Sequence, residues 1–123
     1  MPHVVQLAVS ANGQWLAIGF GIGSFSPGAI RLVDLKAQHV EGDWFSPADS
    51  VVSLAVSHEH GFIAAGLAQG ALVILEPREG AMQEVGRLNV DQARLTAIAI
   101  DSQTGLIVAG SVDHQIRIWD REG

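Results

Sequence analysis

The chain has 123 residues, a formal net charge of −6 and no cysteine. Its length is that of one ordinary domain, and its excess of acidic over basic residues disfavours binding to the phosphate backbone of nucleic acids. The absence of cysteine excludes disulfides and thiolate metal sites, and no stretch of 18 unbroken apolar residues is present to span a membrane.

The first residues, MPHVVQLAVS, contain no basic segment followed by a long apolar run. They therefore do not predict a signal peptide, and we expect a cytoplasmic location. Charged residues make up only 16% of the chain, against about 25% in ordinary soluble proteins. Two explanations of this low charged share stay open. Either the short strands are mostly core, or some apolar surface contacts another chain.

Three apolar patterns recur along the chain in the same order. They are VVQLAVS, VVSLAVS and LTAIAID at 4–10, 51–57 and 95–101; LAIG, IAAG and IVAG at 16–19, 63–66 and 107–110; and AIRLVD, ALVILE and QIRIWD at 29–34, 71–76 and 115–120. In every copy, nine residues lead from the end of the first pattern to the glycine that closes the second. Chance alternation does not reproduce both the order and the interval, so the chain contains a threefold repeat.

Each pattern predicts a β-strand, because β-branched and small residues form short runs between turn-forming residues such as Asn12-Gly13 and Thr104-Gly105. No segment of 11 or more residues has helical periodicity, so we expect no helix. The predicted strands span about 4–9, 14–20, 29–34, 51–56, 62–67, 71–76, 95–100, 106–110 and 115–120.

A glycine-rich segment, GFGIGSFSPG, follows the second strand of the first copy. Its spacing is GxGxG rather than GxGxxG and no helix follows it, so a nucleotide site is excluded. The segment is instead a loop five residues longer than its counterparts. Its apolar residues Phe20, Ile22 and Phe25 are candidate protein-binding residues, because loops on rigid scaffolds often carry recognition. The alternative is a neutral insertion.

Trp44 and Phe45 are a second candidate for protein binding, because aromatic side chains are enriched in the residues that dominate binding energy. The alternative is that Trp44 packs at the outer edge of a sheet core. The sequence leaves both interpretations open.

His58-Glu59-His60 is the cluster that most suggests a metal site, which would need a further ligand from another chain. This triplet falls in a predicted turn, where the other copies also carry polar residues, so we expect a solvated polar turn and no metal or cofactor. No serine lies in a GxSxG elbow, and the carboxylates occupy repeated turn positions. We therefore predict no enzymatic activity and no catalytic residue.

The last hairpin, LIVAGSVDHQIRIWD at 106–120, carries an aspartate in its turn and closes on a tryptophan–aspartate pair. In this respect the chain resembles the WD40-repeat β-propeller family, with Asp113, Trp119 and Asp120 as the matching residues. The family's Gly-His pair is absent; its histidine would fall near Pro47 and Asp91. The resemblance therefore implies that the buried network between that histidine, the turn aspartate and the tryptophan is incomplete.

The resemblance implies an all-β fold of three antiparallel propeller blades with four-stranded topology, as part of a closed β-propeller. Outer strands are expected at 38–44 and 82–88, while the last blade lacks its outer strand. The expected single unit, 1–123, divides into blades at about 3–49, 50–93 and 94–123.

The resemblance also implies a non-catalytic scaffold that binds an unidentified protein or peptide. Three blades cannot close a ring, since propellers have about 4–8. We therefore predict self-association, either as a homodimer with six blades or as a homotrimer with nine. One alternative is a fragment of a larger propeller. Another is a propeller that binds a sugar or small ligand in its channel, near Gln6, Ser53 and Ala97.

Overall fold

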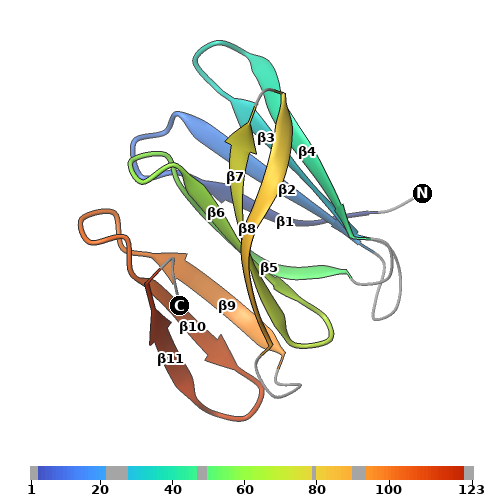
Figure 1. The fold of residues 1–123 in the computed structure, drawn as a ribbon, viewed down its shortest axis with the longest axis vertical. Coiled ribbons are helices and arrows are strands. Elements are labelled where there is room, and N and C mark those ends of the chain that lie inside the picture. Colours follow the sequence, from blue (N-terminus) through green and yellow to red (C-terminus); the bar gives the residue numbers. More distant parts are fainter. Residues whose placement is uncertain (1–2, 22–27, 47–49, 79, 90–93, 121–123) are drawn as a thin grey trace.

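The computed structural model describes residues 3–21, 28–46, 50–78, 80–89 and 94–120 (Figure 1). These residues form eleven strands and no helix. The described part of the chain therefore contains no helix that could cross a membrane. The strands are β1 (His3–Val9), β2 (Trp15–Gly21), β3 (Gly28–Asp34), β4 (His39–Ser46), β5 (Val51–Ser57), β6 (Phe62–Leu67), β7 (Ala71–Arg78), β8 (Ala81–Asn89), β9 (Leu95–Ile100), β10 (Ile107–Ser111) and β11 (Ile116–Trp119).

The strands form three antiparallel sheets that follow one another along the chain. Blade 1 has the order β1-β2-β3-β4, blade 2 has β5-β6-β7-β8, and blade 3 has β9-β10-β11. Figure 1 shows the sheets as a fan, with blade 2 between the other two. The prediction of an all-β fold of propeller-type blades is confirmed, and among the described residues blade 3 has three strands.

The turn between the first two strands contains a glycine in every blade; the hydrogen bond that this glycine makes spans three residues in blade 1 and four residues in blades 2 and 3. Its glycine has a φ of +73°, +75° or +77°, a left-handed conformation that glycine adopts without steric cost. The glycine amide donates a hydrogen bond to the carbonyl at the start of the turn, with N···O distances of 2.9, 2.9 and 2.8 Å. The donor and acceptor residues are Gly13 and Ser10, Gly61 and Ser57, and Gly105 and Asp101.

Two apolar cores hold the fan together, one on each side of blade 2. Trp15, Ile30 and Trp44 of blade 1 pack against blade 2 residues that include Val73 and Leu75. On the other side, a second set that includes Phe62, Leu72 and Ile107 joins blade 2 to blade 3. Strand β2 alternates between buried and partly exposed residues, whereas every residue of β6 is buried. The inner strands of the middle blade are therefore covered on both faces, whereas its outer strand β8 is mostly exposed.

Candidate interaction surfaces

The first candidate surface is the face of blade 1 that points away from blade 2. Direct cross-strand pairs place Leu7, Ile18, Arg31 and Asp43 in one row. Leu7 is 62% exposed. We call this surface the blade 1 open face; its members include Leu7, Val9, Phe20, Arg31, Val40, Asp43 and Phe45.

The second candidate surface is the face of blade 3 that points away from blade 2. Cross-strand pairing forms one row from Ala99, Val108 and Ile118, and another from Ala97, Gly110 and Ile116. We call this surface the blade 3 open face. Ile116 is 75% exposed, and neither row contains a charged residue. The surface includes a hollow of about 290 Å³.

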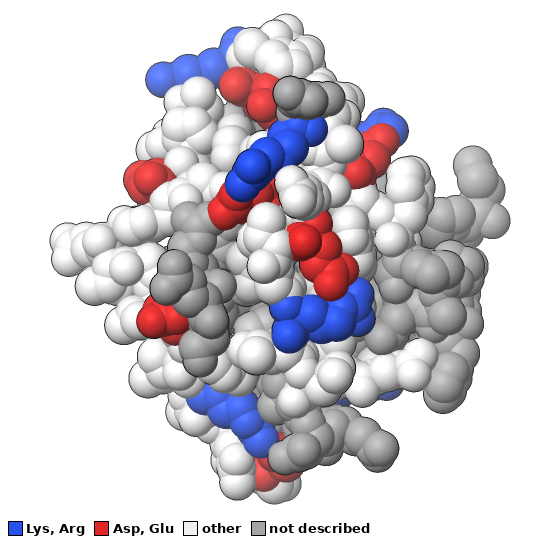
Figure 2. Space-filling model, viewed as in Figure 1, with Lys and Arg blue, Asp and Glu red and all other residues white. Residues whose placement is uncertain are grey.

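The large exposed apolar side chains are concentrated on these two faces. Eleven such side chains occur in the described residues, and seven belong to the open faces. The seven are Leu7, Val9, Val40, Phe45, Val108, Ile116 and Ile118. Contiguous exposed apolar surface of this kind marks contact sites in proteins. The charged groups in Figure 2, by contrast, are scattered over the visible surface among uncharged residues.

The charges on the blade 1 open face neutralise each other. Arg31 Nε donates to Asp43 Oδ1 at 2.8 Å, and Arg31 Nη2 donates to Asp43 Oδ2 at 3.0 Å. These hydrogen bonds hold the pKa of Asp43 below its usual range. The pair adds no net charge, so this face consists of apolar side chains together with one ion pair, Arg31 and Asp43, whose geometry is fixed by two hydrogen bonds.

The structure separates the aromatic residues that the sequence grouped as candidate binding residues. Phe20 and Phe45 line one hollow of about 220 Å³ on the blade 1 open face, and Phe45 is 71% exposed. Trp44 is 9% exposed and belongs to the core against blade 2, because neighbouring strand residues point to opposite faces. This position matches the alternative interpretation of Trp44 as a packing residue. Ile22 and Phe25 lie outside the described residues.

The hairpin turn of blade 3 is built around Asp113. Its carboxylate accepts hydrogen bonds from Arg117 Nη2 at 2.7 Å and Nη1 at 3.2 Å, and a further bond from the Ser111 hydroxyl. Arg117 Nη1 also donates to Ser111 Oγ at 2.7 Å. The bonds from Arg117 first, and from Ser111 second, hold the pKa of Asp113 below its usual range.

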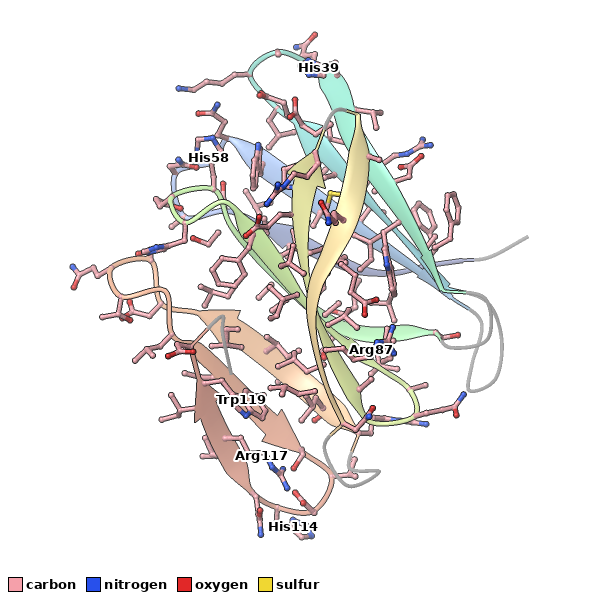
Figure 3. All side chains as sticks on the ribbon, viewed as in Figure 1. His39, His58, Arg87, His114, Arg117 and Trp119 are labelled. Atoms are coloured by element: carbon pink, nitrogen blue, oxygen red, sulfur yellow. The ribbon has the colours of Figure 1, made fainter. Side chains whose placement is uncertain are left out.

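Arg117 is thus a partner of the turn aspartate that the family pattern did not indicate. Figure 3 shows Arg117 near the turn that carries His114, with Trp119 farther along the same strand. Trp119 is partly buried and packs against the core between blades 2 and 3. Asp120 follows β11 and is exposed. An arginine four residues after a turn aspartate was the available sequence signal.

His58 and His60 point toward different neighbouring blades. Asn12 Nδ2 lies 2.8 Å from His58 Nδ1, and the His58 ring meets Trp15 edge-on with centroids 4.8 Å apart. His60 Nε2 lies 3.0 Å from the Ser102 carbonyl oxygen. The described residues include no group of three or more potential metal ligands. The two histidines therefore link the matching turns of the three blades, which the sequence did not indicate.

A groove of about 300 Å³ runs along the first strands of the three blades, and its lining has both apolar and polar surface. Its polar members are Ser57, Glu59 and Ser102. Ser53, expected near the channel, is buried at the junction of blades 2 and 3, where its hydroxyl donates to the Leu95 carbonyl at 2.5 Å.

Comparison with known proteins agrees with this geometry. A family model described as "WD domain, G-beta repeat" matches residues 83–120, from β8 to the end of β11. A search of curated protein sequences found no match to the chain. The prediction of a WD40-type repeat is confirmed for residues 83–120.

Two solved structures share the fold of nearly the whole chain. "Crystal Structure of Mitotic Checkpoint Complex" matches with a TM-score of 0.78 and 20% identity, over 99% of this chain and 35% of that chain. The beta-propeller domain of Myceliophteria thermophila Cps50 (Swd1) matches with a TM-score of 0.74 and 14% identity, over 100% of this chain and 37% of that chain. This chain therefore spans little more than a third of either structure.

Proposed function

We propose that the chain is a non-catalytic, WD40-type interaction module that completes a propeller by self-association. The observation that carries the proposal is the clustering of seven of eleven exposed large apolar side chains on the two open faces. A face of this kind is unfavourable in water and is stabilised when a further blade covers it. Closure of the ring covers both open faces of every copy at once.

Two copies provide the simplest closure. The blade 3 open face of each copy would cover the blade 1 open face of the other, which gives two identical junctions and six blades. Six blades fall within the usual range of about 4–8, whereas the nine blades of a trimer exceed it. The resulting ring would present its loops and turns to a protein partner. The cytoplasmic location stays a prediction.

The rival proposal is that these blades form part of a longer propeller. It is supported by the lengths of the structural neighbours, of which this chain spans 35% and 37%. In that case the missing blades would cover the same open faces, and the isolated chain would not form a defined dimer. The two proposals thus predict different masses for the purified chain.

Light scattering coupled to gel filtration tests the proposal. We expect the mass of two 13.0 kDa chains. Phe45→Ser changes the blade 1 open face and should shift the mass toward one chain. Val85→Ser, on the outer strand of blade 2 where Val85 is 42% exposed, is the matched control and should leave the dimer intact. A monodisperse monomer that unfolds cooperatively would overturn self-association.

A further inference from the structure

Three glycines occupy equivalent positions in the second strand of each blade: Gly19, Gly66 and Gly110. The first two lie at junctions within the chain. A Cβ atom added to Gly19 would be 3.0 Å from Val51 Cγ1, and one added to Gly66 would be 3.1 Å from Leu95 Cβ. Glycine at these positions therefore makes room for the next blade.

The residues that pack against Gly19 and Gly66, which are Val51 and Leu95, are also equivalent to each other. Val51 begins β5 and Leu95 begins β9, so each is the first residue of the first strand in its blade. Both are fully buried, with exposed fractions of 1% and 0%. Each junction within the chain thus places a branched aliphatic side chain over the glycine of the preceding blade.

Gly110 has the same position but no neighbour above it. A Cβ atom added there would meet nothing within 4 Å. Gly110 lies between Ala97 and Ile116 in one row, at the hollow of about 290 Å³ on the blade 3 open face. A glycine inside a strand weakens the strand and marks a place where another backbone or ligand approaches closely. Nothing described within the chain makes that approach to Gly110.

We infer that Gly110 is the floor of a socket that receives the first-strand aliphatic residue of a second copy of this chain. By position in the repeat that residue is Val4, which corresponds to Val51 and Leu95. The inference rests on the self-association proposed above and specifies its contact. It buries no unpaired charge, since the rows around Gly110 are uncharged and Arg31 of the other face is paired with Asp43.

The test compares Gly110→Val with Gln83→Val in the full chain. The first variant fills the socket, and the second places the same side chain on an exposed position of β8, outside both open faces. Sedimentation equilibrium should show self-association at least tenfold weaker for Gly110→Val, and within twofold of the original for Gln83→Val. We expect both variants to fold, since the chain itself leaves the space at Gly110 open. Circular dichroism spectra that match the spectrum of the original chain would establish this.

Further variants make the outcomes distinguishable. Gly110→Ala should weaken self-association less than Gly110→Val does. It replaces Gly110→Val in the test if the valine variant does not fold. Val4→Ala should also weaken association, because it shortens the side chain expected in the socket. A dimer of unchanged affinity in the glycine variants would overturn the socket and leave self-association standing. A dimer sensitive at Gly110 but not at Val4 would overturn Val4 as the occupant. A monomeric original chain would overturn the proposed function itself.

Discussion

Substitution of Gly66 by alanine should destabilise the junction between blades 2 and 3. The added Cβ would overlap Ser53 Oγ and lie 3.0 Å from the Leu95 carbonyl oxygen. Those two atoms already share a buried hydrogen bond of 2.5 Å. The Ser53 side chain therefore has to move, and its movement breaks the bond between the blades.

The cost follows from three contributions. Leaving a buried hydrogen-bonding group unsatisfied costs about 1–3 kcal/mol, and forcing an extra methyl group into a packed core costs about 1–3 kcal/mol. Removing a glycine from a strand returns about 0.5–1 kcal/mol. We therefore expect a net loss of about 1–5 kcal/mol in the free energy of unfolding. Gly19→Ala should cost less, because its tightest neighbour is the side-chain atom Val51 Cγ1 at 3.0 Å.

Urea denaturation followed by circular dichroism measures these losses, provided that the slope of free energy against urea concentration stays constant. The double variant Ser53→Ala/Gly66→Ala removes the hydroxyl that the new methyl group meets, so it should lose less than the sum of the single variants. An unaffected Gly66→Ala variant, or strictly additive losses, would refute the close-packed junction described above.

Three further variants test other parts of the structure. Trp44→Ala should cost about 3–5 kcal/mol in urea denaturation because it empties a core position, whereas Val85→Ala on the exposed outer strand should change stability by less than about 1 kcal/mol; equal losses would contradict the assignment of Trp44 to the core. His114→Gly should raise the melting temperature, since His114 has a φ of 67° and a left-handed conformation costs a non-glycine residue about 1–2 kcal/mol; a lower melting temperature would refute this. The pKa of Asp113 is lower in the folded chain than in the unfolded chain, so the unfolded state binds this proton more readily. Asp113 therefore stabilises the fold at pH values above the ordinary carboxyl pKa, and this contribution is lost as the pH falls through the pKa of the folded state. Urea midpoints measured from about pH 5 to pH 2 should therefore fall less steeply for Asp113→Asn than for the original chain, and parallel curves would contradict the pairing with Arg117.

The repeat made the strands predictable. Strands predicted at 62–67 and 95–100 are observed as Phe62–Leu67 and Leu95–Ile100. This agreement has a local cause, because runs of β-branched residues and turn glycines act on the few residues around them. The candidate contact residues were harder to assign. Trp44 and Phe45 are adjacent aromatic residues on one strand, and only the neighbouring sheet decides which of the two is buried.

The sequence by itself determined the number of repeats, the order of their strands and the glycine turns, since each is encoded in short stretches of chain. Only the tertiary structure decided how the blades stack, which placed Ser53 inside a junction and turned His58 and His60 toward different blades. It also distinguished Gly66, covered by Leu95, from Gly110, which faces open space. The physical reason is that a strand's alternation defines two faces, while the burial of each face depends on a sheet distant in sequence.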